Sequence, residues 1–355
     1  MEARGALSPT ARRVRASLGY GVALLIALAL PQVVYPGLAL NVLLWGLFAI
    51  SLDLLLGFGG LLSFGHAAFW GGAGYAAGIA ARRLDLPFPL AALLGTAFAV
   101  LLALPIGYLS IRRRGIYFAM VTLAFAQMVY YVANEWRDVT GGENGVRDVP
   151  RLLGDLSLPS GSRSFYYAAL PLALLGYWLA YRIVRSPFGH VLVAVRDNEA
   201  RAQALGYPTR RYKLLAFLLS AGLAGLAGSL FALGHGFASL EQVHWTVSGL
   251  VVMMVILGGV GTLWGSVIGA ALVLLLQDWL STSNLTIGSV GLRDAWGIVT
   301  GIIFAIIVLS FRRGIWGTLI RLNPRLVRGA RPRTLAPTAE EVATASQPEG
   351  SGTGD

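Results

Sequence analysis

Long apolar stretches with few charges recur along the whole chain and predict membrane-spanning helices. A helix needs about 20 apolar residues to cross about 30 Å of hydrocarbon. Asp53 is the only acidic or basic residue between Ser17 and Ala81. We predict ten spans: 18–36, 38–58, 61–81, 88–110, 115–134, 165–181, 214–240, 246–258, 263–277 and 295–311. Eight or nine crossings are alternatives, because the two short segments before and after Gly258-Gly259-Val260-Gly261 are compatible with half-helices or with one broken element.

The composition agrees with a membrane location. Of the 355 residues, 56% are apolar and only 13% are charged, and the mean hydropathy is +0.67. Soluble domains carry about 25% charged residues. The chain is therefore predicted to be an all-α, polytopic membrane bundle of 8–10 segments, and dehydrogenases or nucleic-acid-binding modules are poor candidates despite the net charge of +11. The absence of cysteine excludes disulfides and thiolate chemistry.

The positions of the basic residues predict the orientation. If the spans alternate from an inner N-terminus, the inner side receives four basic residues from the leader, Arg112–Arg114, seven between Arg182 and Lys213, and seven between Arg312 and Arg333. This bias follows the positive-inside rule and predicts that both termini are cytoplasmic. The pair Arg82–Arg83 falls on the outer side and is the exception.

The same pattern divides the chain into regions. Residues 1–17 form a basic leader, and the apolar run after it has no clear cleavage site, so we expect it to stay attached. Residues 18–312 form the transmembrane domain, with an external loop at 135–164 and a cytoplasmic loop at 185–213. Residues 313–355 are first basic and then rich in Ser, Thr, Pro, Gly and Glu, which predicts a disordered cytoplasmic tail.

Motifs for enzymatic chemistry are missing from the sequence. A phosphate-binding loop of the GxxxxGK[ST] type requires a lysine that the chain does not supply, because its one lysine, Lys213, lies in Arg211-Tyr212-Lys213-Leu214. HExxH and GxSxG are also absent, and the four histidines are scattered. We therefore predict no catalytic residues, no metal site and no ATP hydrolysis by this chain alone.

Two of the polar residues within the predicted spans are candidates for function. A charge within the bilayer is costly, so Asp53 and His66 are candidates for a role in transport. Asp53 lies near the predicted inner end, where hydration is easy. A structural hydrogen bond is the alternative role for both residues.

Two glycine-rich segments about 200 residues apart resemble each other. Leu56-Gly57-Phe58-Gly59-Gly60 resembles Leu257-Gly258-Gly259-Val260-Gly261, and further Trp and Gly residues follow each of them. Paired glycine-interrupted segments in the two halves of a transporter indicate the translocation path, whereas close helix packing is the alternative. The candidate path residues are Gly59, Gly60, Ser63, Gly65, His66, Gly258, Gly259 and Gly261.

The cytoplasmic loop contains a further predicted helix. Ser186-Pro187-Phe188-Gly189 ends the preceding span, His190–Leu205 has helical spacing, and Gly206 and Pro208 end it. Asp197 and Arg201 form an i, i+4 pair on one face, and another face carries Val191, Val195, Ala202 and Leu205. The residues alone leave two roles open: a plain loop helix, or a docking element for a soluble partner.

Several motifs together resemble one family, the LivM-type permease subunits of branched-chain amino-acid ABC importers. They occur in family order between about residues 35 and 315: Leu55–Phe69, Arg114–Ala124, Thr140–Gly145, Ser186–Gly189, Ala194–Glu199, Ala204–Gly206, Tyr212–Phe217 and Leu257–Gly265. Leu61 stands where the family commonly has Gln. Single motifs are modest indications, but the ordered set is specific.

The resemblance implies a permease of the bacterial inner membrane that imports branched-chain amino acids. It implies four partners: a homologous second permease, two cytoplasmic ABC ATPase subunits and an extracytoplasmic binding protein. ATP would be used by the partners, and this chain would bind no cofactor and no nucleic acid. Closure of the ATPases would push the predicted cytoplasmic helix and switch the bundle from inward-open to outward-open. The residues expected to couple to the ATPase are Arg196, Asp197, Asn198, Glu199, Ala202, Leu205 and Gly206.

Two other substrates or mechanisms stay open. Related members carry urea or short amides, so this branch of the family is the nearest alternative. An ion-coupled secondary transporter would need buried coupling charges, and the sequence offers few beyond Asp53.

Overall fold

The computed structural model describes residues 25–153, 156–157, 163–282, 286–287, 290–291, 301–302, 305 and 314–322. The predicted leader, most of the predicted tail and most of the predicted span 295–311 lie outside the described residues. Residues 25–33, the described part of the first predicted span, are helical.

Helices make up nearly all of the described chain. They are α2 (Pro36–Asp53), η1 (Leu54–Phe58), α3 (His66–Arg83), α4 (Phe88–Ser110), α5 (Ile116–Glu135), α6 (Arg137–Thr140), η2 (Gly142–Asn144), α7 (Arg163–Arg185), α8 (Pro187–Asp197), α9 (Glu199–Ala204), α10 (Thr209–His235), η3 (Leu240–Val243), α11 (Trp245–Gly258), α12 (Leu263–Thr282) and α14 (Gly314–Leu322). Two short antiparallel pairs complete the set: β1 (Leu152–Leu153) with β2 (Leu156–Ser157), and β3 (Thr286–Ile287) with β4 (Val290–Gly291).

Six of the described helices are long and apolar enough to cross a membrane. They are α2 with η1, α4, α5, α7, α10 and α12. The most apolar window of α2 is 89% buried and that of α10 is 67% buried, whereas the windows of α5 and α7 are only 28% buried. Helices α2 and α10 therefore form the centre of the bundle, and α5 and α7 lie at its edge. The predicted helical membrane bundle is confirmed.

Aromatic side chains fill the contact between the central helices. Trp70 of α3 lies 4.5 Å from Phe48 of α2 and 5.0 Å from Phe231 of α10, measured between ring centroids. Trp45 joins the same cluster at 5.2 Å from Trp70. Because offset and tilted aromatic pairs add to the free energy gained from burial, this cluster fixes how α2, α3 and α10 pack together.

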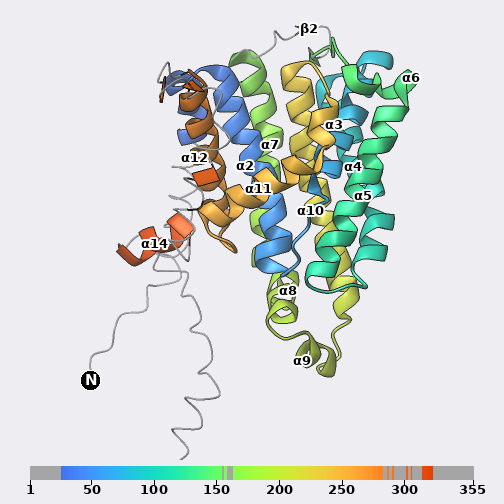
Figure 1. Ribbon diagram of the computed structural model, residues 1–355, viewed down its shortest axis with the longest axis vertical. Helices are drawn as coiled ribbons and strands as arrows, with labels where there is room; N and C mark the ends of the chain where they lie inside the picture. The colour runs from blue at the N-terminus through green and yellow to red at the C-terminus, as the bar shows by residue number, and fades with distance from the viewer. Residues whose placement is uncertain are drawn as a thin grey trace, which may run out of the picture. The chain divides into compact units, whose positions relative to one another are not determined.

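The predicted cytoplasmic and external loops lie at opposite ends of the bundle. Figure 1 shows α8 and α9 below the long helices and α6 and β2 above them. The guanidinium of Arg83 donates a hydrogen bond to the carbonyl of Asp138 at 2.6 Å, so the exceptional basic pair lies at the same end as the external loop. That loop is also paired with the segment after α10, through a bridge between Val146 and Ala238. The two loops therefore lie at opposite ends of the bundle, and the assignment of one end to the cytoplasm stays a prediction.

Three predicted spans differ from the observed elements. The span predicted at 61–81 begins as a helix only at His66, because residues 59–65 are not helical. Helix α11 has 14 residues and a length of about 21 Å, which is too short to cross a bilayer. Helix α12 has 20 residues and ends at Thr282, five residues beyond the predicted end. The second glycine-rich segment therefore separates a short helix, drawn across the other helices in Figure 1, from a long one.

Candidate functional site

The first glycine-rich segment interrupts a helix at the centre of the bundle. Asp53 ends α2, the five-residue π-helix η1 follows, and the chain leaves helical geometry until α3 begins at His66. Gly60 has a φ of 68°, in the left-handed region that favours glycine. Single π-helical turns occur frequently at functional sites. The interruption leaves buried residues, among them Ser63 and Gly65, without helical hydrogen bonds, while Gly60 is exposed.

Side-chain hydroxyls hold this interrupted backbone. Thr122 of α5 accepts a hydrogen bond from the Phe64 N–H at 3.2 Å, and Ser248 of α11 accepts one from the Ala67 N–H at 2.8 Å. The local hydroxyl of Ser63 accepts from the Gly65 N–H at 3.2 Å. Because buried backbone donors need partners, these hydroxyls stabilise the start of α3. They also connect it to α5 and α11.

His66 is fully buried and bound to α10. Its Nε2 lies 2.7 Å from the hydroxyl of Ser220, and that hydroxyl donates to the carbonyl of Ser51. Since the hydroxyl proton is used there, Ser220 must accept from His66, which assigns the neutral tautomer with its proton on Nε2. Among the described residues, Nδ1 has no hydrogen-bond partner. The structural hydrogen bond expected as one role of His66 is therefore present, and a role in the path stays a prediction.

The two glycine-rich segments meet. Asp53 Oδ1 accepts a hydrogen bond from the Gly261 N–H at 2.7 Å. A Cβ added at Gly57 would overlap both this carboxylate oxygen and the Gly261 nitrogen. The segments, about 200 residues apart in sequence, therefore touch backbone to backbone, and glycine at position 57 is required for this contact. Asp53 has the structural hydrogen bond expected as one of its roles.

The second glycine-rich segment is a tight turn between α11 and α12. Gly259 and Gly261 have φ values of 121° and 77°. A Cβ at Gly258 would overlap the carbonyl of Gly265, one turn into α12. The Thr262 hydroxyl donates to the Gly259 carbonyl and closes the turn. Close packing therefore accounts for Gly258, while the positive φ values account for the other two glycines.

The predicted helix from His190 to Leu205 is in fact two helices, α8 and α9. Asn198 separates them with φ −156° and ψ 96°, and its Oδ1 accepts a hydrogen bond from the Arg201 N–H at 2.8 Å. The single-helix prediction is wrong because asparagine is a strong N-cap, which competes with continued helix. The predicted pair of Asp197 with Arg201 is wrong for the same reason. Asp197 instead pairs with Arg196 at 2.8 Å.

Arg196 connects α8 to the first glycine-rich segment. Its guanidinium donates a hydrogen bond to the carbonyl of Gly57. Its methylene groups lie over Gly60, where an added Cβ would be 2.7 Å from Arg196 Cγ. Helix α8 therefore touches the end of the interrupted helix directly.

Glu199 is held by its own protein. Its carboxylate lies 2.8 Å from Lys213 Nζ of α10 and 3.2 Å from Arg114 Nε of the turn before α5. Thr209 donates a further hydrogen bond to it at 3.3 Å. Burial alone raises the pKa of Glu199, but the neighbouring cations outweigh burial and hold that pKa below its ordinary value. Glu199 therefore fastens α9 to two other elements.

The residues predicted to couple to an ATPase divide into exposed and buried ones. Asp197, Asn198 and Gly206 are exposed, and Leu205 is 71% exposed. Ala202 is only 4% exposed. The expectation that Leu205 shares a face with the buried Val195 and Ala202 is wrong, because α9 ends at Ala204 and Leu205 lies just beyond the last helical residue.

The contacts of the site include residues that sequence reasoning missed. They are Arg114, Thr122, Lys213, Ser220 and Ser248. The sequence carries no clear signal for Lys213, because it is one of seven basic residues between Arg182 and Lys213 that could have paired with Glu199. Isolated hydroxyl residues in apolar spans carry no clear signal either.

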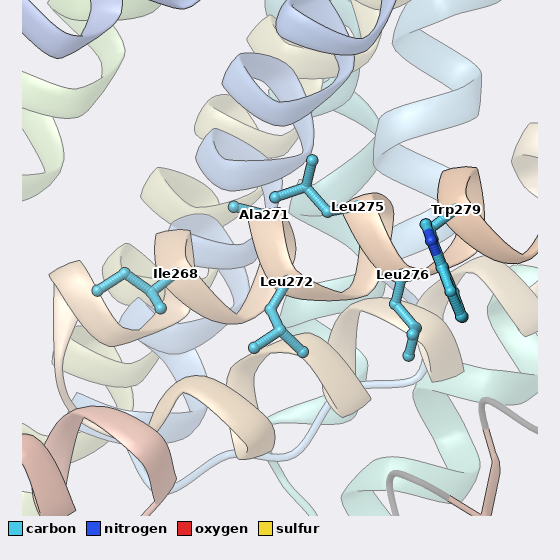
Figure 2. Close-up of a pocket in the computed structure, with 6 residues that line it drawn as sticks. All are labelled: Ile268, Ala271, Leu272, Leu275, Leu276 and Trp279. Atoms are coloured by element: carbon cyan, nitrogen blue, oxygen red, sulfur yellow. The ribbon is translucent and has the colours of Figure 1, made fainter. Parts of the chain in front are cut away.

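Other parts of the described chain offer less chemistry. Within the described ranges, no group of three or more His, Cys, Asp or Glu is placed to hold a metal ion. A groove of about 520 Å³ runs along α12 and is shown in Figure 2. Its lining is Ile268, Ala271, Leu272, Leu275, Leu276 and Trp279. This apolar lining cannot orient a polar solute.

A helical bundle with interrupted helices at its centre and a charged helix pair at one end is the architecture of a transport permease. The family described as "Branched-chain amino acid transport system / permease component" matches residues 35–309. The chain belongs to this family.

Curated relatives agree. The "High-affinity branched-chain amino acid transport system permease protein LivM" of Salmonella typhimurium is 30% identical over 299 residues, covering 75% of this chain and 69% of that protein. LivM of Escherichia coli matches equally. The "Inner membrane ABC transporter permease protein YjfF" of Escherichia coli is 29% identical, covering 74% and 79% of the two chains. The structure of PsaBC from Streptococcus pneumoniae in complex with Fab aligns over 82% of this chain and 96% of that chain, with a TM-score of 0.40 and 14% identity.

These comparisons and the six apolar helices show a multi-pass permease of the inner membrane that belongs to an ABC transport system. The predicted family, class and location are confirmed. Permeases of such systems work with ATPase and other subunits.

Proposed function

We propose that this chain is the permease subunit of an importer of branched-chain amino acids. The observation that carries the proposal is the family match over residues 35–309, together with two LivM proteins whose names give this substrate class. Another relative, 37% identical over 142 residues, is named as a permease of an autoinducer 2 import system. Because substrates differ within the family, the choice of solute needs a direct test.

The translocation path follows the interrupted segments. Backbone groups at interrupted helices can bind charged ends of a zwitterion without a fixed side-chain charge. Around the start of α3 these donors are now bound by the hydroxyls of Ser63, Thr122 and Ser248. A backbone N–H can exchange its hydrogen bond to a hydroxyl for one to a solute carboxylate at little net cost, since the N–H has an acceptor in both states. The path residues predicted from the sequence therefore remain the candidates.

The α8–α9 segment docks on an ATPase subunit. Its exposed side chains, including Asp197 and Leu205, form the docking surface, while Glu199 and Ala202 face the permease and support that surface. Closure of the ATPases then pushes α8 and α9 and drives the switch from inward-open to outward-open. In this proposal the chain itself neither binds nor hydrolyses ATP, and it assembles with a second permease, two ATPases and an extracytoplasmic binding protein.

Uptake in cells that lack this subunit tests the solute. Cells complemented with the wild-type chain should regain uptake of labelled leucine, isoleucine and valine, and excess unlabelled leucine should compete while urea should not. Competition by urea or a short amide, without competition by leucine, would assign the chain to the other branch of the family.

Docking has its own test. Leu205→Glu places a charge on the exposed docking surface without disturbing a buried contact. The variant should reach the membrane at the wild-type level but retain less ATPase subunit on co-purification. Wild-type retention of the ATPase would contradict docking through this surface.

A further inference from the structure

Two hydrogen bonds connect helix α8, through the end of α2, to the turn between α11 and α12, which is distant in sequence. Arg196 of α8 donates to the carbonyl of Gly57 in η1. Asp53, four residues earlier, accepts from the N–H of Gly261 in the turn at 2.7 Å. The end of α2 therefore lies between the two and is bonded to both.

Packing leaves this junction little freedom. Asp53 is fully buried, and the backbones of Gly57 and Gly261 touch because Gly57 has no side chain. Arg196 lies across Gly60, and its guanidinium is also held by Asp197 through bonds of 3.0 and 2.8 Å. No hinge is available between α8 and the turn unless one of these contacts breaks.

Breaking the hydrogen bond between Asp53 and Gly261 is unfavourable. If the α11–α12 turn moved away from α2, the Asp53 carboxylate would lose a donor while still buried, and the Gly261 N–H would lose its acceptor. Buried groups without partners are costly. Since the cost falls on both groups, the turn follows the end of α2 more readily than it separates from it.

We propose that Asp53 is a positioning residue that makes α8, the end of α2 and the α11–α12 turn move as one body during transport. The proposal rests on the proposed function, because it assigns how ATPase movement reaches the second glycine-rich segment. Asp53 would act by its hydrogen bond to Gly261 rather than by binding solute.

Truncation of the side chain tests the hydrogen bond. The complex with its partner subunits is reconstituted in vesicles, and uptake of labelled leucine is divided by ATP hydrolysed. Asp53→Ala should lower this ratio about tenfold, in the range by which coupling contacts act, whereas Asp53→Asn keeps the acceptor oxygen and should stay close to wild type. Ser110→Ala, a truncation of a buried polar side chain at the end of α4, is the matched control.

The outcomes decide the proposal. A wild-type ratio of uptake to ATP hydrolysed in Asp53→Ala would overturn the proposal. An equal loss in Asp53→Asn and Asp53→Ala would also overturn it, because the charge of Asp53 would then matter and not its hydrogen bond to Gly261. If Asp53→Ala does not assemble, Arg196→Ala breaks the other bond and should lower the same ratio. The exposed Arg113, in the turn before α5, provides its control as Arg113→Ala.

A distance measurement tests the common movement without any solute. The chain has no cysteine, so Ala194→Cys on α8 and Val260→Cys in the turn, both exposed, can carry a pair of spin labels. The distance between the labels should be the same in the nucleotide-free and ATP-bound complex, and should differ between these states once Asp53→Ala is added. A change in the otherwise wild-type background would overturn the proposal. An importer of another solute would still give the constant distance, so failure of the proposed function and failure of this inference are distinguishable.

Discussion

The two glycine-rich segments have similar sequences but different structures. The first is a π-helical turn followed by non-helical chain, which is bound at Phe64 by a hydroxyl of α5. The start of α3 that follows is bound by hydroxyls of α10 and α11. The second is a compact turn that lets α11 and α12 pack closely. The first also touches α8, through Arg196. Glycine therefore serves the same steric purpose in both, close approach of backbones, while the surrounding polar residues determine what each segment binds.

The two segments are suited to different roles in transport. Hydroxyl partners from three helices make the first segment and the start of α3 responsive to small shifts of those helices, which suits a path that opens and closes. The second segment has its polar groups satisfied within its own turn and by Asp53, which suits a part that moves as a body.

Filling the contact between the segments should have the largest effect. In Gly57→Ala, the new methyl group overlaps Asp53 Oδ1 and the Gly261 backbone. Backbone cannot move aside as a flexible side chain does, so we expect destabilisation of about 3 kcal/mol or more and loss of uptake. Membrane level and uptake of the variant are the measurements, and wild-type uptake would show that the segments do not meet.

Packing within the second segment gives the next effect. Gly258→Ala overlaps the carbonyl of Gly265 and should destabilise the protein by about 1–3 kcal/mol. Gly249→Ala, in the same α11, is the matched control, because nothing lies within 4 Å of its added Cβ. The control should gain about 0.5–1 kcal/mol from helix propensity. Thermal unfolding in detergent compares the two, and equal midpoints would contradict close packing of α11 on α12.

Removing the α11 hydroxyl that binds the start of α3 should have a moderate effect. Ser248→Ala leaves the buried Ala67 N–H without its acceptor, at a cost of about 1–3 kcal/mol. Ser248→Thr keeps a hydroxyl and should recover much of the loss. The unfolding midpoint reports the cost, and an equal loss in both variants would show that space at position 248 matters and not the hydrogen bond.

The smallest effect concerns the support of α9 and depends on pH. The pKa of Glu199 is held below its ordinary value of 4.5 in the folded protein. Its carboxylate therefore stabilises the fold above that pH, and the contribution is lost as the pH falls through the lower folded pKa. In Glu199→Gln the unfolding midpoint should decline less steeply on acidification below about pH 4.5. An unchanged acid profile would mean that the ion pairs with Lys213 and Arg114 contribute nothing to stability.

The sequence predicted the fold better than the site. Apolar runs and basic clusters identify the spans and opposite loops, because the bilayer imposes length and charge rules that act residue by residue. The break at Asn198 was missed because capping competes locally with helical spacing, and α8 and α9 read as one helix. The contact of Gly57 with Gly261 was also beyond the sequence. Two similar glycine motifs suggest related roles, but only packing brings segments about 200 residues apart together.

In the proposed mechanism, this junction is driven by subunits other than this chain. Reconstitution in vesicles tests it directly, by measuring accumulation of labelled leucine against its gradient with and without the ATPase subunits. The account predicts uphill accumulation only when the ATPases, the second permease, the binding protein and ATP are present. Uphill accumulation by this chain alone, driven by a proton or sodium gradient, would contradict it.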